Sequence, residues 1–241
     1  MSGKTNGGSA SGKAAFFIIF AAGLIALALY LIKMDRVELE GTRYVDRDDA
    51  LQMLYPEEDR RLSAVLYDML LGQKRDLLFD NIRIRPSGFG KVRITVKENP
   101  ADCLIKTEEG YAVVNRNGAV ICMLPDAPEE LTVLMGLDIR AAEKYRRVSA
   151  GDDALFADAL ELARLVRASG IPCESIFCQQ DDFIFVTGNI TIRFGSQENA
   201  EEKLAAILDM YPSLVGLKGT LHVEDHNGAD EDGKYYFEVS H

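Results

Sequence analysis

The residue types best suited to metal chemistry gather near the end of the chain. All three histidines lie there, and two of them, His222 and His226, stand beside Glu224 and Asp225. Imidazole and carboxylate groups are zinc ligands. A histidine pair four residues apart meets one ion best on a helix, however, and this stretch has the pattern of a strand followed by a turn. The sequence therefore predicts no metal centre here.

The acidic segment 225–233, DHNGADEDG, has the composition of a calcium loop. An EF-hand loop needs alternating oxygen ligands, then Gly, and a Glu six positions later. Ala229 breaks that pattern. We predict a solvated acidic turn between two strands, with no bound cation.

Four cysteines, Cys103, Cys122, Cys173 and Cys178, could form two disulfides in three different pairings. No C-x-x-C is present, which argues against a redox motif or a zinc ribbon. The sequence favours free buried thiols and leaves the two-bridge alternative open. We find no nucleophile with a base and an orienting group, so the prediction is a non-enzymatic protein without cofactor or small-molecule substrate.

The final stretch is the strongest candidate for binding another protein. Side chains of a strand alternate between its faces, which sets Tyr235, Phe237 and Val239 against Tyr236 and Glu238. At the edge of a sheet, unpaired N–H and C=O groups can receive a strand from a partner. An ordinary edge strand with one face in the core fits the same pattern, and the two interpretations are compatible.

One apolar segment must anchor whatever follows it. Residues 14–32 read AAFFIIFAAGLIALALYLI, nineteen residues without a charge. As a helix they would be about 28 Å long, close to the ~30 Å hydrocarbon core of a bilayer. A core helix would show a polar stripe, and a cleaved signal peptide would have a shorter apolar region ending in small residues. The prediction is an uncleaved transmembrane helix, which places these side chains in membrane lipid: Phe16, Phe17, Ile18, Leu24, Leu27 and Leu31.

The two sides of this segment differ in composition. Residues 1–13 are a Gly/Ser-rich tail too polar to fold, and residues 1–34 hold three lysines and no acid. The rest holds 24 basic and 38 acidic residues, which together give the formal charge of −11. That acidic balance argues against nucleic-acid binding. Basic residues flank both sides, so the positive-inside rule is ambiguous; we favour a cytoplasmic tail and an extracytoplasmic body.

The first part of the body, residues 35–104, is predicted to be a small α+β domain. Its order is β-α-α-β-β: a strand at 37–41, helices at 47–54 (capped by Asp46) and 59–71, and a hairpin of 82–85 and 92–96 around a turn at 86–90. The hairpin's outer face would carry a basic patch that suits acidic partners or lipid headgroups, or is simply a solvated sheet face: Arg83, Arg85, Arg93 and Lys97.

The second part, residues 105–240, is predicted to be a mixed β domain with two helices. The expected strands are 111–114, 119–123, 131–134, 175–178, 183–186, 190–194, 219–223 and 234–239. The expected helices are 154–168, capped within 151–153, and 199–210, capped by Ser196.

Short motifs in this order, after one apolar segment, resemble those of the FtsQ/DivIB family of bacterial cell-division proteins. The motifs are VELEGTRYV at 37–45, FDNIRI at 79–84, KVRITVKENP at 91–100, YAVVNRNG at 111–118, Leu124-Pro125, and ITIRFG at 190–195 followed by Lys203-Leu204. The sequence departs from the family at 222–225, HVED, where an Asp-Leu-Arg-Tyr is frequent, and at Asn99, where Arg is usual.

The resemblance implies a POTRA domain at 35–104, and a β domain at 105–240 whose last strands bind partners. It implies a non-enzymatic scaffold at the division septum. Such a scaffold recruits and orders FtsB/DivIC-type and FtsL-type proteins and the septal peptidoglycan synthases, by strand addition at its C-terminal edge. The alternative is a membrane-tethered POTRA protein of secretion or envelope assembly. That protein would be expected to carry several POTRA units or a β-barrel, and neither is found in the sequence.

Overall fold

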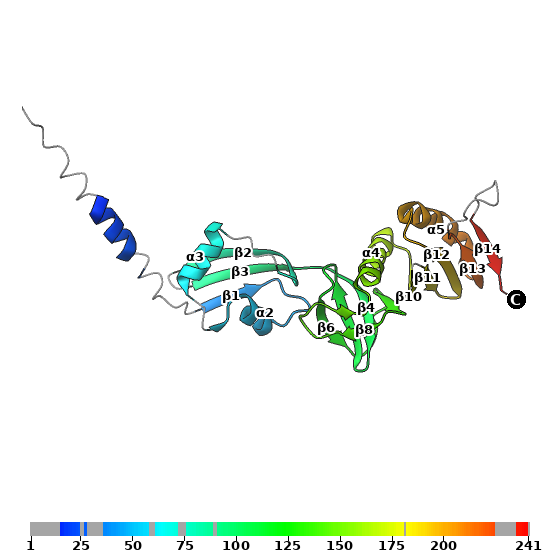
Figure 1. Ribbon diagram of the computed structural model, residues 1–241, viewed down its shortest axis with the longest axis horizontal. Coiled ribbons are helices and arrows are strands. Elements are labelled where there is room, and N and C mark those ends of the chain that lie inside the picture. Colours follow the sequence, from blue (N-terminus) through cyan, green and yellow to red (C-terminus); the bar gives the residue numbers. More distant parts are fainter. Residues whose placement is uncertain are drawn as a thin grey trace, which may run out of the picture. The chain divides into compact units, whose positions relative to one another are not determined.

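A computed structural model describes residues 15–24, 27, 36–57, 61–71, 76–88, 91–180, 182–224 and 235–240 (Figure 1). It is a mixed α+β structure that divides into two compact units, Met1–Glu98 and Asn99–His241. The boundary predicted between residues 104 and 105 is wrong, because it falls inside a strand of the second unit, Ala101–Thr107. Five consecutive residues of that strand are buried, so it lacks the alternation that would have indicated it.

The first unit has the predicted order β-α-α-β-β, which is confirmed. Its elements are β1 (Arg36–Glu40), α2 (Arg47–Leu54), α3 (Leu62–Leu71), β2 (Phe79–Gly88) and β3 (Lys91–Glu98). The sheet order is β1-β3-β2, with β1 parallel and β2 antiparallel to the central β3. Alternate side chains of β3 (Val92, Ile94 and Val96) are buried, and its other face is exposed.

Polar side chains fix the loops and helices of this unit. The Asp46 carboxylate accepts from the amides of Asp48 and Asp49, so the predicted cap of α2 is confirmed. The Tyr55 hydroxyl, at the end of α2, donates to Asp68 of α3 at 2.6 Å. Tyr55 is buried, and this part-buried hydrogen bond ties the two helices together.

Pro86 and Gly88 belong to β2 and not to the predicted turn at 86–90; residues 89 and 90 lie outside the described part. β2 is an edge strand, and its register with β3 shifts between Pro86 and Gly88. A proline, which has no N–H to donate, is accommodated at an edge or a bulge.

The predicted membrane span is described only at residues 15–24 and 27, all helical and exposed. Phe16, Phe17, Ile18, Leu24 and Leu27 are among them, and each side chain is more than half exposed. Leu31 and the remaining residues of 14–32 lie outside the described part. Of the helices that the described residues form, none combines the length and the apolar character needed to cross a membrane.

The second unit is built on one nine-stranded sheet of order β14-β13-β12-β11-β10-β7-β4-β5-β6. The strands are β4 (Ala101–Thr107), β5 (Gly110–Asn115), β6 (Val120–Leu124), β7 (Thr132–Met135), β10 (Ser175–Gln179), β11 (Asp182–Thr187), β12 (Ile190–Gly195), β13 (Gly219–His222) and β14 (Tyr236–Val239). A small separate pair consists of β8 (Ile139–Ala141) and β9 (Ser149–Ala150). Two helices, α4 (Asp153–Ser169) and α5 (Ala200–Leu214), pack with alternate strand residues in one core.

Both helices of this unit were predicted, with differences at their ends. The Asp152 carboxylate accepts from Ala154 and Leu155, and Gly170 ends α4 in the left-handed conformation at φ 78°, as expected. α5 begins after Asn199, which makes no side-chain cap, so the predicted cap at Ser196 is wrong. α5 also continues past Pro212 to Leu214, which is buried in the core.

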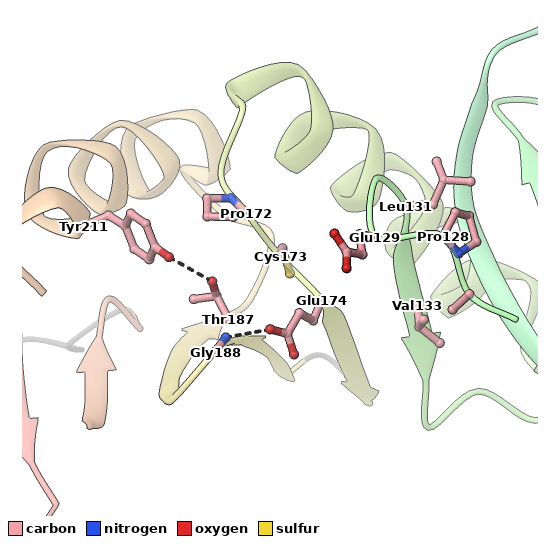
Figure 2. Close-up of a pocket in the computed structure, with 11 residues that line it drawn as sticks. Pro128, Glu129, Leu131, Val133, Pro172, Cys173, Glu174, Thr187, Gly188 and Tyr211 are labelled. Carbon is pink, nitrogen blue, oxygen red and sulfur yellow. Dashed lines mark hydrogen bonds between the residues drawn. The ribbon is translucent and has the colours of Figure 1, made fainter. Parts of the chain in front are cut away.

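A pocket of about 610 Å³ opens where the middle strands β7 and β10 begin and β11 ends (Figure 2). It lies between the loop before β7, the segment Pro172–Glu174 before β10, the turn between β11 and β12, and α5. All of its lining residues belong to the second unit.

Candidate protein-interaction edge

β14 is the outermost strand of the nine-stranded sheet and carries most of the residues predicted to bind a partner. It pairs antiparallel with β13, where His222 faces Tyr236 and Gly219 faces Val239. Among the described residues no strand pairs with its outer side. Residues 225–234, which include His226 and the acidic loop, lie outside the described part.

The ladder between β13 and β14 decides which backbone groups of β14 remain open. The Ser240 amide donates to the Lys218 carbonyl at 2.9 Å. In an antiparallel pair, hydrogen-bonded pairs alternate with pairs that make no hydrogen bond. Even-numbered residues of β14 therefore bond to β13, whereas the N–H and C=O groups of Phe237 and Val239 point toward the open edge.

The side chains of β14 divide between the two faces of the sheet. Phe237 is partly buried against the core that α5 covers. Tyr236 and Glu238 lie on the opposite face and are exposed. Tyr235, just before the strand, and Val239, at its end, are exposed at 38% and 52%. Phe237 thus packs into the core, and the other four side chains are exposed to solvent.

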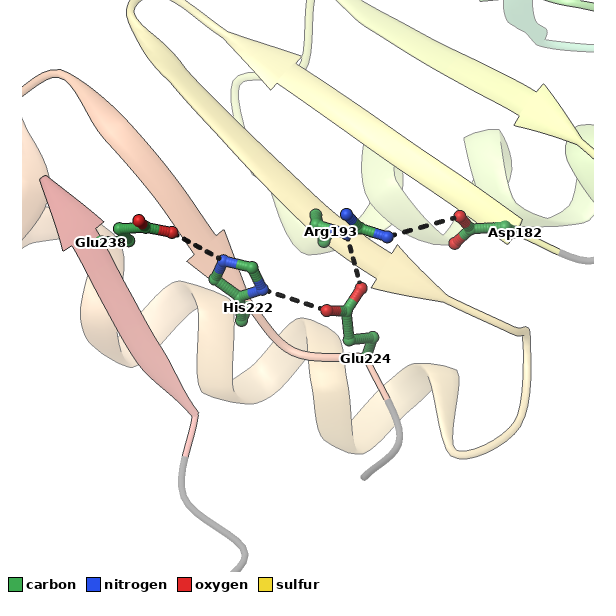
Figure 3. A network of polar contacts seen from close by, with 5 residues as sticks. All are labelled: Asp182, Arg193, His222, Glu224 and Glu238. Carbon is green, nitrogen blue, oxygen red and sulfur yellow. Dashed lines mark hydrogen bonds and ion pairs between the residues drawn. The ribbon is translucent and has the colours of Figure 1, made fainter. Parts of the chain in front are cut away.

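A polar network joins β14 to the next three strands (Figure 3). His222 Nδ1 lies 3.0 Å from Glu224 Oε1, and Arg193 Nε donates to Glu224 Oε2 at 2.7 Å. On its other side, His222 Nε2 lies 3.7 Å from Glu238 Oε2 of β14. Arg193 also reaches Asp182 of β11, at 4.0 Å. The imidazole therefore stands between two carboxylates from different segments.

Charge and burial in this network act on Glu224. Burial disfavours its ionised form, but hydrogen bonds from His222 and Arg193 favour it more, and the pKa of the Glu224 carboxyl lies below its usual value. The hydrogen bond between Arg193 and Glu224 also raises the pKa of the Arg193 guanidinium. Glu224 is thus held as a carboxylate by one cation and one imidazole.

The network is part of a longer row on the sheet face opposite α4 and α5. Register places Tyr236 beside His222, His222 beside Arg193, Arg193 beside Ile184, and Ile184 beside Phe177. Phe177 is 42% exposed. Next to the open edge the sheet therefore presents aromatic, basic and aliphatic groups together.

Sequence reasoning missed Arg193 and considered His222 only as a metal ligand. The alternation of buried Ile190, Ile192 and Phe194 does predict that Arg193 points away from the core. The partner of Arg193 was hidden, because β12 and β13 are parallel strands separated by a helix.

The other candidate groups lie elsewhere and do not form a second centre. All four cysteines are free thiols; Cys103, Cys173 and Cys178 are buried. Burial raises the pKa of Cys173 and of Cys178 to about 12, and it raises the pKa of Cys103 as well. Within the described residues, no three His, Cys, Asp or Glu side chains are grouped as metal ligands.

The predicted basic patch of the first unit is partly neutralised. Arg93 lies 3.1 Å from Glu38 and 3.6 Å from Glu40, both on β1. Lys97 pairs with Asp80 of β2 at 2.9 Å. The acidic residues of the neighbouring strands thus turn the expected basic face into a mixed one.

Comparison of the chain with models of known protein families and with curated proteins found no match.

Proposed function

We propose that this chain is a membrane-anchored, non-enzymatic scaffold of the FtsQ/DivIB type that receives a partner strand along β14. One observation carries the proposal: β14 is outermost in its sheet and directs the backbone groups of Phe237 and Val239 outward. Main-chain hydrogen bonds supply affinity in strand addition, and neighbouring side chains supply specificity. Here those side chains are Tyr236, Glu238 and Val239.

Two further features support the proposal. The first unit has the order β-α-α-β-β, with β1 and β3 parallel, which agrees with a POTRA domain. The apolar segment 14–32 suits an anchor with a cytoplasmic tail and an extracytoplasmic body. The proposed partners are FtsB/DivIC-type and FtsL-type proteins, with septal peptidoglycan synthases nearby, at the division septum.

A proline at position 239 tests the strand-addition mechanism. The Val239 amide points away from β13, so Val239→Pro removes an outward donor and leaves the β13–β14 ladder intact. Binding of the full chain in detergent to a DivIC-type partner should weaken by about three- to tenfold, as loss of one strand hydrogen bond predicts. Val239→Ala keeps the N–H and should bind nearly as the original chain does.

Equal binding by Val239→Pro and Val239→Ala would show that the partner does not bind along this edge. Hydrogen exchange of the Glu238 amide checks that β14 stays docked in both variants. Depletion of the protein tests the division role itself: filamentous cells are expected, and normally dividing cells would contradict the proposal.

A further inference from the structure

The acidity of the chain belongs almost entirely to its second unit. Residues 1–98 contain 15 basic and 13 acidic residues, a balance of +2, whereas residues 99–241 contain 12 basic and 25 acidic residues, a balance of −13. A surface of one sign attracts partners of the other sign and accelerates their encounter. The second unit is therefore suited to basic segments of other proteins.

The pocket beside the starts of β7 and β10 combines apolar walls with acidic groups at its mouth. On one side the wall is Leu131 and Val133, both buried, with Pro128 beside them. On another side are Pro172 and the ring of Tyr211. Of the residues that line this pocket, none is a lysine, arginine or histidine.

Two carboxylates come to this pocket from separate segments. Glu174, before β10, accepts from the Gly188 amide through Oε1 at 2.9 Å, which holds it beside the turn between β11 and β12. Glu129 comes from the loop before β7 and, within the described residues, makes no hydrogen bond or ion pair. Figure 2 shows the Glu129 carboxylate between its own loop and the segment that carries Cys173 and Glu174.

The phenol of Tyr211 completes the pocket in a fixed orientation. Its hydroxyl lies 3.2 Å from the hydroxyl of Thr187, a buried residue of β11. The aromatic ring is thereby held at the pocket wall. Tyr211 therefore forms a fixed wall of the pocket on the side of α5.

We propose that this pocket binds an arginine side chain from a basic segment of a partner polypeptide. The apolar stem of arginine suits walls of proline, leucine and valine. Its planar guanidinium can donate to the Glu129 and Glu174 carboxylates together, which a compact ammonium group does less well. The pocket is formed by residues other than those of β14, so the inference does not rest on the proposed strand addition.

Other ligand chemistries fit these residues less well. Phosphates and carboxylates would meet two negative groups and no base in the pocket lining. A purely apolar ligand would contact the apolar walls and leave both carboxylates without a partner from the ligand. A cation with an apolar stem uses the walls and the carboxylates together.

Nuclear magnetic resonance of the full chain tests the inference directly. The chain is labelled with 15N-glycine in detergent micelles and titrated with N-acetyl-arginine methylamide, which mimics an arginine within a polypeptide. The Gly188 amide, bonded to Glu174, should show a saturable shift. The citrulline analogue has nearly the same shape without the charge, and it should bind at least about tenfold more weakly, as loss of charge-assisted hydrogen bonds predicts.

Paired variants locate the site. Glu129→Gln should weaken arginine binding about fivefold or more, whereas Glu130→Gln, at the exposed neighbour outside the pocket lining, should change it little. The inference is overturned if the Gly188 amide does not shift, if citrulline binds equally, or if the two variants behave alike. Tighter binding of free arginine than of the capped form would overturn the polypeptide source and indicate an amino-acid site.

Discussion

The imidazole of His222 lies parallel to the ring of Tyr236, with 4.4 Å between ring centroids and 8° between their planes. The two residues face each other across β13 and β14. β14 pairs with only one described strand, β13. The ring stack adds to the hydrogen bonds that hold β14 on the sheet. The stack therefore stabilises the position of β14, the candidate partner-binding strand, beside β13.

Removing the stack should loosen β14 without unfolding the unit. An aromatic pair contributes about 0.5–1.5 kcal/mol beyond buried area, so Tyr236→Ala should speed exchange of the Glu238 amide about fivefold. Hydrogen-exchange mass spectrometry of the C-terminal peptide measures this. Tyr235→Ala, at the exposed neighbour outside the stack, is the control. Equal protection of β14 in both variants would show that the stack does not hold the strand.

Much of the fold could be predicted because its local signals are strong. Asp46 and Asp152 precede apolar helices and cap them, and Gly170 ends α4 as expected. β4 was missed, because a strand buried on both faces has no polar alternation and the preceding Pro100 resembles a domain end. The single nine-stranded sheet was also beyond prediction, since β4 pairs with β7, and β7 with β10, in parallel. Such pairs join segments far apart in the chain, which no local pattern reports.

The candidate site, too, could be predicted only in part. β14 and its alternation were predicted from Tyr235 to Val239, because an aromatic strand after an acidic loop is a local pattern. The contacts of Arg193 and His222 depend on the parallel register of β12 and β13, which the sequence does not reveal.

The Glu224 carboxylate should make the second unit sensitive to acid. Its pKa in the folded protein is lowered from 4.5 by hydrogen bonds from His222 and Arg193. A lowered pKa gives stability that is present above pH 4.5 and is lost as the pH falls through the folded value. Glu224→Gln should therefore cost about 1 kcal/mol at pH 7, and the difference from the original chain should shrink below pH 4.5.

Urea unfolding of the full chain at several pH values, monitored through hydrogen exchange of β12 and β13, measures this difference in stability. Glu109→Gln, at an exposed acidic residue, should show neither the cost nor the pH dependence. A Glu224→Gln cost that stays constant down to pH 3.5 would contradict the assigned role.

Glu98 should be one of the most sensitive positions of the first unit. Its carboxylate accepts from three consecutive amides, Arg43 and Val45 at 2.7 and 2.9 Å and Tyr44 at 3.0 Å. Glu98→Ala leaves these donors without their acceptor, and a loss of about 2–3 kcal/mol is expected. Glu40→Ala removes only an exposed ion pair with Arg93 and should cost less than about 1 kcal/mol.

Thermal unfolding followed by circular dichroism, with peptide-level hydrogen exchange to assign the transition to residues 36–98, distinguishes the two variants. Similar losses for Glu98→Ala and Glu40→Ala would mean that water replaces the carboxylate at the three amides without cost.

The buried thiols should resist alkylation in the folded protein. The thiolate is the reactive form, and burial raises the pKa of Cys173 and Cys178 to about 12 and also raises that of Cys103. At pH 8 in iodoacetamide these three residues should stay unmodified, while Cys122, which is only partly buried, should react first. In urea all four should react at similar rates, because unfolding removes the burial that separates them. Peptide mass spectrometry reads each site, and labelling of Cys173 or Cys178 as fast as Cys122 in the native chain would show that the core beneath α4 opens far more readily than its packing indicates.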